Sequence, residues 1–570
     1  MDAHKARIND FFNNSTLLEV PFFQRPYVWK EDLWERLLGD MEYVVKTNKS
    51  HFLGSVILKE GRKPNPGEQF ASCKTIVDGQ QRLTTFIIFM KVLSLKKGET
   101  TLFDYQFKIM GKEIALRHGK SDCAAFEKVV SMNKAEKIEG DNSRIVEAYN
   151  FFVENMDADN LEIMTIISNA EFVRIDLDAH EDEQQIFDTI NSLGVSLTTS
   201  ELLKNYFFSR DTIKEYEEKW EAVFEKDDDT KTYWEKEVEV GRAKRAMIDI
   251  FFDAYFQIFI QDKSYNISTE DKIMYARLDH LAQSYQHFIN TYCNGDKSVV
   301  LSSLKEYAEI FKNIINPEFC DESIPATYGV ERINIVIFGL KNSTLIPYIL
   351  YVAKNVANQN DFNRICGMLE SFVMRRMIVR ATTKNYNNLF TSFVTNKIVD
   401  PDELSKKLLS GTDGTVYYPS DMELQDGFDN SKMYNLQTKG VLYLMESGIR
   451  PATSSTQLLG FNGYSLEHMM PKKWRNNWNA CADENAEKER DSKLLTLGNL
   501  AIIPQSLNAS VRDADWTTKK AGKKDKPGLD VCAAGLITLH DALDKEVWNE
   551  NEIENRANWL CEEAVKLWKI

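Results

Sequence analysis

A long stretch with few glycine and proline residues occupies the middle of this chain of 570 residues. From about residue 211 to residue 400 it is rich in Tyr, Phe, Leu, Ile, Lys and Glu, and apolar residues recur at helical spacing within residues 247–259. We therefore expect a mostly helical middle region over residues 211–440, with this stripe packed in its core. Residues 401–440 hold clusters of Pro, Gly, Ser and Asp, which are typical of a hinge or long connection.

The zone before the middle region, residues 1–210, mixes two kinds of pattern. Short apolar runs at residues 52–58 and 172–177 predict strands. Helical spacing over residues 31–46, and again from Leu83 onward, predicts helices. This mixture of short strands and helices predicts an α/β domain.

The zone after the middle region, residues 441–570, returns to short elements around His468 and ends in a helix from about Ile553. A chain of this length is expected to form roughly two to four domains. We expect an α+β multidomain protein whose domains span residues 1–210, 211–440 and 441–570.

Composition excludes several classes of protein. Hydrophobic residues make up 43% and charged residues 27%, which is ordinary for a globular protein, and the net charge of −16 argues against a polycation that coats nucleic acid. The eight cysteines include no CxxC pair and suggest neither a zinc ribbon nor a disulfide framework. The chain shows no signal peptide and no apolar stretch long enough for a bilayer. We expect a soluble cytoplasmic protein without membrane contact.

Three polar segments interrupt the patterns of the first zone, and the earliest is Pro-Phe-Phe-Gln-Arg-Pro-Tyr-Val-Trp at residues 21–29. Gln24 and Arg25 place hydrogen-bond donors beside aromatic surfaces, and Pro26 restrains the residue before it to an extended backbone. Arginine suits bidentate phosphate binding, and an aromatic ring such as that of Tyr27 can stack on a base. The alternative is a strand-to-helix junction whose aromatic residues belong to the core.

The second segment, Val-Asp-Gly-Gln-Gln-Arg at residues 77–82, directly precedes an apolar helix. A helix N-terminus offers unpaired N–H groups to phosphate, and Arg82 can add charge-assisted hydrogen bonds. Asp78 could hold Mg²⁺, orient a water molecule or cap the helix, and Asp-Gly could also be a plain turn. No GxxxxGK[ST] motif is present, so this is not a P-loop. The candidate residues here are Asp78, Gly79, Gln80, Gln81 and Arg82.

The third segment, residues 186–198, reads as a helix that ends at Asn-Ser-Leu-Gly, with Gly194 at a C-terminal capping position. Ser200 is then expected to cap the next helix, over residues 201–208. A purely structural role is adequate for this third segment.

Together with His-Phe-Leu-Gly-Ser at residues 51–55, these segments resemble the GmrS-type, ParB-related domain, because four separated motifs occur in the right order over about residues 8–210. The resemblance implies a domain of bacterial anti-phage systems that binds and hydrolyses a nucleoside triphosphate. Asp78 becomes the candidate catalytic carboxylate. The residues that would line the nucleotide or phosphate site are Gln24, Arg25, Asp78, Gln80, Gln81 and Arg82. Leu193 stands where the family often has Arg.

In the third zone, Glu467 and His468 are followed by Leu-Gly-Asn-Leu at residues 497–500 and by Asn508. At a strand end, adjacent Glu and His side chains point in opposite directions, so that one can hold a metal while the other faces a water molecule. A metal-assisted phosphodiesterase needs a histidine that takes a proton from water and oxygen ligands for a hard cation. Asn499 could brace the loop or the histidine ring. The alternative is a Glu–His pair on the surface.

This segment, over about residues 440–570, looks like the GmrD-type His-Asn-His (HNH, ββα-metal) nuclease domain. The resemblance rests on Glu-His-Met-Met-Pro, on Leu-Gly-Asn-Leu and on Asn508 with the segment that follows it. It makes His468 the general base and Asn499 the central asparagine of the catalytic set. It also makes Glu467 and Asn508 ligands of Mg²⁺ or Mn²⁺.

Basic residues gather around the same segment. Lysines at this density contact phosphates without reading sequence, although they could also lie in a solvated loop. The candidate DNA-binding residues are Lys472, Lys473, Lys519, Lys520, Lys523 and Lys524. In the middle region, Arg375 and Arg376 lie on a helical pattern, where they could bind DNA, signal between domains or simply pack.

Both halves in one chain resemble a fused GmrSD-type, modification-dependent restriction enzyme. The resemblance implies an anti-phage endonuclease that cuts or nicks modified double-stranded phage DNA under the control of nucleotide binding or hydrolysis. Its expected cofactors are Mg²⁺ or Mn²⁺ at the nuclease site and an NTP in the N-terminal domain. The alternative is a nucleotide- or DNA-sensing component of a defence system whose specificity comes from a partner protein. A homodimer is compatible with both.

Overall fold

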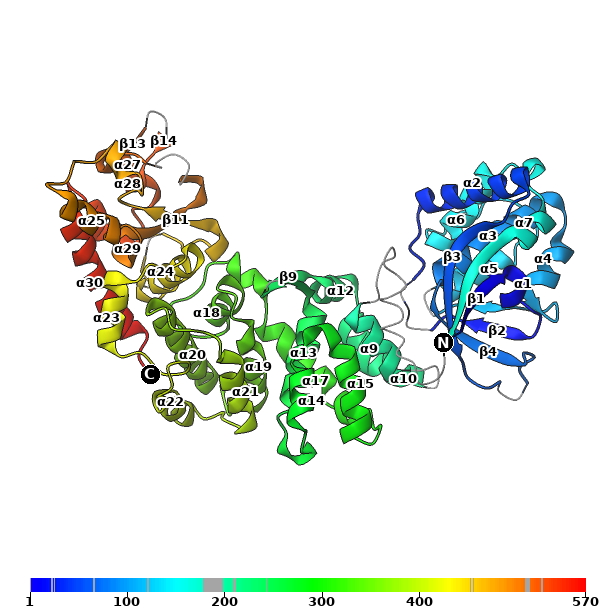
Figure 1. Ribbon diagram of the computed structural model, residues 1–570, viewed down its shortest axis with the longest axis horizontal. Coiled ribbons are helices and arrows are strands. Elements are labelled where there is room, and N and C mark those ends of the chain that lie inside the picture. Colours follow the sequence, from blue (N-terminus) through cyan, green and yellow to red (C-terminus); the bar gives the residue numbers. More distant parts are fainter. Residues whose placement is uncertain are drawn as a thin grey trace. The chain divides into compact units, whose positions relative to one another are not determined.

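The chain folds into two compact units, Met1–Glu218 and Lys219–Ile570 (Figure 1). The computed structural model describes residues 2–21, 24, 26–64, 67–119, 122–177, 198–208, 212–241, 243–451, 453–454, 456–507, 513–523 and 526–570.

A six-stranded mixed sheet organises the first unit (Figure 1). Its strands lie in the order β1–β8–β3–β4–β2–β7, and β4 pairs antiparallel with β3 and parallel with β2. The strands are β1 (Asp2–Arg7), β2 (Thr16–Glu19), β3 (His51–Glu60), β4 (Ser72–Asp78), β7 (Leu116–Arg117) and β8 (Ala170–Leu177), and a separate hairpin joins β5 (Lys108–Ile109) to β6 (Glu113–Ile114). Because β4 is an inner strand, the residues that follow it leave the sheet from its middle.

Helix α3 (Gln80–Lys97) lies at the centre of this unit and is buried around nearly its whole circumference. It packs against α4 and α6, which explains why its sequence has no continuous polar face. The helices of the unit are α1 (Ile8–Phe11), α2 (Glu31–Thr47), α3, α4 (Thr100–Phe107), α5 (Cys123–Val130), α6 (Arg144–Asn155), α7 (Ile163–Asn169), α9 (Thr199–Phe207) and α10 (Ile213–Tyr216).

The elements predicted for this unit are confirmed with small shifts. The helix predicted over residues 31–46 is α2, and the strands predicted over residues 52–58 and 172–177 are β3 and β8. The helix predicted from Leu83 begins three residues earlier, at Gln80, because the turn directly before it already starts the helix. The α/β character of this zone is therefore correct.

The third polar segment falls largely outside the described residues, since residues 178–197 are not among them. The expectation that Ser200 caps the next helix is wrong. Thr198 is the N-cap of α9: its Oγ1 accepts from the Glu201 N–H at 3.2 Å, and the Glu201 carboxylate accepts from the Thr198 N–H at 2.7 Å. This reciprocal pair is a capping box.

The second unit is mostly helical, as predicted for the middle region, and carries three small antiparallel strand pairs. The apolar stripe within residues 247–259 lies on α13 and is buried. No helix in the described part of the chain is long and apolar enough to cross a membrane.

The helices of the second unit are α11 (Ala222–Phe224), α12 (Asp228–Glu235), α13 (Met247–Phe259), α14 (Thr269–Tyr275), α15 (Leu281–Tyr292), α16 (Ser298–Leu301), α17 (Leu304–Ile314), α18 (Val330–Asn334), α19 (Ile346–Asn355), α20 (Gln359–Ile378), α21 (Tyr386–Thr395), α22 (Pro401–Leu409), α23 (Asp421–Asn430), α24 (Asn435–Ile449), α25 (Glu484–Lys493), α27 (Trp516–Ala521), α28 (Leu529–Cys532), α29 (Ile537–Leu543) and α30 (Glu550–Leu567). Its strands are β9 (Glu237–Val240), β10 (Ala243–Ala246), β11 (Tyr464–His468), β12 (Leu500–Pro504), β13 (Gly522–Lys523) and β14 (Lys526–Pro527).

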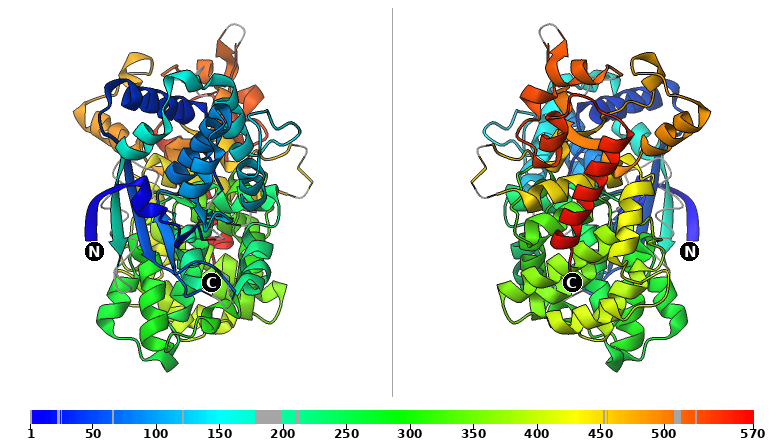
Figure 2. Two further views of the ribbon diagram at one scale, coloured as in Figure 1. Left: turned by 90° about the vertical axis from the view of Figure 1, so that its right-hand side faces the viewer. Right: turned by 90° about the vertical axis from the view of Figure 1, so that its left-hand side faces the viewer.

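The expectation of a hinge over residues 401–440 is wrong. This segment forms α22, α23 and the start of α24. Asp400 caps α22 by accepting from the Glu403 N–H, and Ser420 caps α23 in a capping box. Asp400, Pro401 and Ser420 are therefore signals of helix starts and not of a linker. Helix α23 packs along the final helix, α30 (Figure 2).

A buried ion pair ties the end of the chain into the helical region. Arg332 on α18 and Glu370 on α20 are both fully buried, and the Arg332 Nε donates to Glu370 Oε2 at 3.0 Å. The indole N–H of Trp568 donates to Glu370 Oε1 at 2.9 Å, and Arg375 Nε donates to the Trp568 carbonyl at 2.7 Å. Arg376 donates to backbone carbonyls in the same way. Arg375 and Arg376 thus pack inside the unit, where they cannot contact DNA.

We expect Arg332→Met to destabilise the second unit by about 3–5 kcal/mol, because it leaves the buried Glu370 carboxylate without a counter-charge. The double variant Arg332→Met/Glu370→Gln should recover part of this loss. Thermal unfolding measures both effects. Lys566→Met is the matched control, since its ion pair with Glu563 involves an exposed lysine and should contribute less than about 1 kcal/mol. Equal losses in Arg332→Met and Lys566→Met would contradict the prediction.

Candidate functional sites

The first candidate site forms where β4 ends and α3 begins. Gly79 has a φ of +97°, and a Cβ at this position would lie 2.9 Å from the Val56 side chain, so only glycine fits the turn. The chain therefore passes directly from Asp78 to the N-terminus of α3. The N-cap of this helix is Gly79, which has no side chain to cap it, so Asp78 does not occupy the N-cap position.

The side chain of Arg82 folds back over this turn. Its Nη1 donates to the Ser55 carbonyl at 2.8 Å and lies 3.3 Å from Asp78 Oδ2. Gly54 has a φ of +116°, and a Cβ there would lie 2.8 Å from Arg82 Nε. The glycine of His-Phe-Leu-Gly-Ser therefore makes room for the guanidinium group, and this motif meets the Asp-Gly-Gln-Gln-Arg motif at one place.

The glutamines of the first two motifs bind backbone groups. The Gln24 Nε2 donates to the last two carbonyl groups before Asp78, at 3.3 and 3.4 Å. Gln81 accepts from the Val28 N–H at 2.9 Å and donates to the Pro26 carbonyl at 3.3 Å. Both side chains are buried. The Oε1 of Gln24 is buried and has no hydrogen-bond partner within the described part of the chain. These two residues hold the polar segment around Pro26 against the β4–α3 turn.

Tyr27 lies in the core, as the alternative interpretation of its motif expected. It is 3% exposed, its hydroxyl bonds with Thr85 Oγ1 at 2.6 Å, and it accepts from Trp34 Nε1 at 2.8 Å. Burial raises its pKa. This ring does not stack on a base in the conformation described.

Gln80 is half-buried at the first position of α3, and Arg25 lies outside the described residues.

The second candidate site forms at the end of β11. This strand pairs antiparallel with β12, so that Glu467 lies opposite Ala501 and His468 opposite Leu500. The Glu467 carboxylate is buried and accepts a hydrogen bond from the Lys519 ammonium group on α27. The same ammonium donates to the His468 carbonyl at 2.6 Å. Burial raises the pKa of Glu467 and lowers that of Lys519.

The imidazole of His468 is uncharged near pH 7. Its Nε2 is buried and has no hydrogen-bond partner within the residues described. Burial, with smaller contributions from Lys472 and Lys519, lowers its pKa to about 4. The ring is therefore neutral near pH 7 and can accept a proton.

Asn499 and Gly498 fix the loop beside this histidine. Asn499 is fully buried, accepts from the Met470 N–H at 2.8 Å and donates to the Met470 carbonyl at 2.9 Å. A Cβ at Gly498 would lie 2.1 Å from the Ile553 carbonyl, so glycine is required where α30 crosses. Of the two roles the sequence left open, Asn499 braces the loop and does not touch the imidazole ring.

Arg556 is a structural residue that the motifs did not reveal. It is buried on α30 and donates to the carbonyls of Leu497, Gly498 and Leu500 at 2.8–3.0 Å. Its one sequence signal is an arginine on the otherwise apolar face of the final helix.

The structure separates the lysines predicted to bind DNA. Lys472, Lys473 and Lys523 are exposed. Lys520 is half-buried and donates to two backbone carbonyls. Lys519 is fully buried in the pair with Glu467, so it cannot act as a surface phosphate contact in this conformation. Lys524 and Asn508 lie outside the described residues.

Two family models match the chain. The model of the N-terminal domain of GmrSD restriction endonucleases matches residues 8–208, and that of the C-terminal domain matches residues 418–563. The chain belongs to the GmrSD restriction endonuclease family. A comparison with curated proteins finds no match. Since members of this family are restriction endonucleases, DNA is the partner that the family implies. The N-terminal match contains the β4–α3 site, and the C-terminal match contains the β11–β12 site.

The C-terminal GmrSD match begins at residue 418, directly before α23. It therefore includes α23 and α24, which pack against α30. These contacts place both helices in the same folded part as the β11–β12 hairpin.

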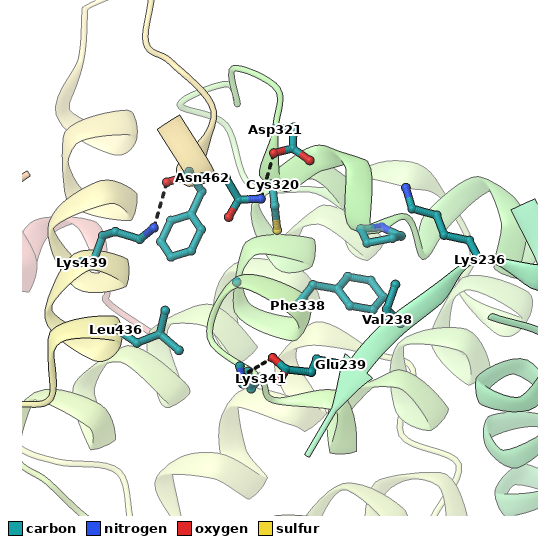
Figure 3. Close-up of a pocket in the computed structure, with 13 residues that line it drawn as sticks. Lys236, Val238, Glu239, Cys320, Asp321, Phe338, Lys341, Leu436, Lys439 and Asn462 are labelled. Carbon is teal, nitrogen blue, oxygen red and sulfur yellow. Dashed lines mark hydrogen bonds and ion pairs between the residues drawn. The ribbon is translucent and has the colours of Figure 1, made fainter. Parts of the chain in front are cut away.

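A pocket of about 340 Å³ lies beside the residues that lead into β11 (Figure 3). Lys439 on its wall donates to the carbonyls of Phe461 and Tyr464 at 3.1 and 3.2 Å and fixes the start of the strand. Lys341 and Glu239, also on the wall, form an ion pair. None of the site residues predicted from the sequence lines this pocket.

The burial of His118 makes the folding stability of the first unit depend on pH. Its buried ring lies 3.1 Å from Thr84 Oγ1, and Thr84 donates to the Gln80 carbonyl at 2.7 Å. Burial lowers the pKa of His118 to about 3. Because this value is below that of an unfolded histidine, the unfolded chain binds more protons between the two values. The resulting stability is complete above about pH 6.5 and is lost progressively as the pH falls toward 3.

We expect the first unit to lose about 2–3 kcal/mol of stability through His118 between pH 6.5 and pH 4.5. Thermal unfolding of the full chain at both values should show a smaller loss in His118→Gln than in the wild type. The exposed His4 provides the control, His4→Gln, which should behave as the wild type does. The same pH dependence in His118→Gln and in the wild type would contradict the assignment.

Proposed function

We propose that this GmrSD restriction endonuclease cuts DNA at an HNH-type site in which His468 is the general base. The observation that carries this proposal is the buried Nε2 of His468, which has no hydrogen-bond partner within the described residues and belongs to the residue that follows Glu467 in β11. A neutral imidazole can take a proton from the attacking water. The order of β11, β12 and α27 supports an assignment to the ββα-metal class.

The residues at this site fit a divalent cation. Glu467 supplies carboxylate oxygens, which Mg²⁺ and Mn²⁺ prefer as ligands, and Asn508 is the proposed second ligand. No group of three or more His, Cys, Asp or Glu residues gathers within the described part of the chain. Mg²⁺ in proteins usually keeps several water ligands and binds through one or two carboxylates. Such a cation stabilises negative charge on the leaving oxygen of a phosphodiester.

We further propose that the first unit, as a ParB-like domain, binds and hydrolyses a nucleoside triphosphate at the β4–α3 turn. The N-terminus of α3 and the guanidinium of Arg82 provide positive charge for phosphate. Asp78 is half-buried beside Arg82, where a carboxylate can hold a cation or orient water. Since Gln24 and Gln81 bind backbone groups, their proposed role is to shape this site. The proposed chemistry is supplied by Asp78 and Arg82.

The proposed substrate is double-stranded phage DNA that carries a modification, and nucleotide turnover in the first unit controls its cleavage. The exposed Lys472, Lys473 and Lys523 are the proposed phosphate contacts. Two endonuclease-domain matches in one chain do not favour the alternative of a purely sensing component.

We expect His468→Ala to slow cleavage of modified phage DNA about 10²- to 10⁴-fold, because the general base is lost. The assay compares modified and unmodified DNA with Mg²⁺, with and without each NTP. The control is His540→Ala, which removes an exposed histidine from the same unit. Wild-type rates in His468→Ala would refute the assignment of the base.

We expect Asp78→Ala to abolish phosphate release from the NTP while the protein stays folded, because the change removes the carboxylate and its ion pair with the partly exposed Arg82. Asp159→Ala removes an exposed carboxylate of the same unit and should leave the rate unchanged. If wild type binds an NTP without releasing phosphate, the domain is a sensor without turnover. Unchanged release by Asp78→Ala would place the hydrolytic site elsewhere.

A further inference from the structure

We propose that Lys519 is an internal counter-ion that competes with the divalent cation for the carboxylate of Glu467. The site would then have two states, one in which Glu467 pairs with Lys519 and one in which Glu467 binds the cation. This inference rests on the proposed function of Glu467 as a ligand, and the experiment below separates the failure of one from the failure of the other.

The Lys519–Glu467 pair is part of the folded core of the hairpin. Lys519 has no exposed surface, and Glu467 is 5% exposed. The helix that carries Lys519 is fixed at its start: Asp515 caps it by accepting from the Thr518 N–H at 2.9 Å. The indole N–H of Trp516 donates to the Lys545 carbonyl at 2.9 Å. The ammonium group is therefore held at the carboxylate by the fold and does not reach it as a mobile surface side chain.

Electrostatics sets the two cations in competition. A buried carboxylate needs a counter-charge, and here the ammonium provides it before any metal arrives. The ammonium donates to Oε1 of Glu467, and its charge repels a divalent cation at the same carboxylate in this poorly solvated place. The cation therefore binds more tightly to molecules in which Lys519 has left Glu467, and its apparent affinity falls as the fraction of such molecules falls.

The released lysine stays close to the reaction centre. Its ammonium also donates to the His468 carbonyl at 2.6 Å, and this bond does not depend on Glu467. Lys519 thus remains beside the general base in both states. We assign it the role of a positioning residue that sets how readily the site takes up its cation.

The test measures Mn²⁺ binding to the full chain by electron paramagnetic resonance, without DNA. Removal of the competing charge in Lys519→Met should tighten binding about tenfold or more. The matched control is Lys545→Met, which removes a lysine from another Lys–Glu pair of the same unit and should leave the Mn²⁺ affinity as in the wild type. Equal affinities in Lys519→Met and the wild type would overturn the inference.

Glu467→Gln shows whether the cation binds here at all. If this variant binds as much Mn²⁺ as the wild type, Glu467 is not a ligand and the proposed metal site fails together with the inference. If Glu467→Gln loses a Mn²⁺ site but Lys519→Met binds Mn²⁺ no more tightly than the wild type, only the competition is refuted.

Thermal unfolding gives a second readout that does not depend on activity. Lys519→Met should unfold at a lower temperature than the wild type without a cation, and Mn²⁺ should raise its unfolding temperature more than that of the wild type. The double variant Glu467→Gln/Lys519→Met should be more stable than Lys519→Met and insensitive to Mn²⁺. If the double variant folds while Mn²⁺ fails to stabilise Lys519→Met, the ammonium and the cation do not exchange and the proposal is wrong.

Discussion

The carboxamide of Asn499 sets the geometry of the loop that follows His468. Its oxygen accepts from the Met470 N–H and from the Trp548 indole N–H, and its nitrogen donates to the carbonyls of Met470 and Leu494. These four bonds fill the hydrogen-bonding capacity of the amide in a fully buried place. Each would cost about 1–3 kcal/mol to leave unsatisfied. The segment directly after His468 is therefore fixed to the start of β12 and to Trp548, two residues before α30.

A related arrangement occurs in the first unit with glutamine in place of asparagine. Gln24 and Gln81 hold the segment around Pro26 through backbone groups. Amides suit this role because they donate and accept without a net charge. Both polar atoms of Gln81 are bonded, whereas Oε1 of Gln24 has no partner within the described residues. A polar residue in a motif is thus as often part of the scaffold as of the chemistry. At the β4–α3 turn the charged groups are Asp78 and Arg82, which form an ion pair with each other.

The sequence was sufficient to predict the elements whose periodic pattern extends over many residues. It was also sufficient to place His468 at a strand end. It misassigned residues 401–440 because Asp, Ser and Pro mark helix starts as well as linkers, and only the residues after them distinguish the two. It also read the lysine-rich run as one surface. Trp516 and Lys519 lie three residues apart and so share a face of α27, and that face is buried. This spacing was the signal that one lysine points inward.

The charge balance of the whole chain explains why a buried lysine belongs at the nuclease site. The net charge of −16 repels DNA, and the exposed lysines near β11 offset this only locally. An unpaired Glu467 carboxylate would add negative charge beside His468, the general base of the proposed mechanism. Lys519 cancels that charge within the core, without a surface ammonium that salt would screen. In the proposed mechanism, this pairing lowers the repulsion of a phosphate by a group that does not itself reach the surface.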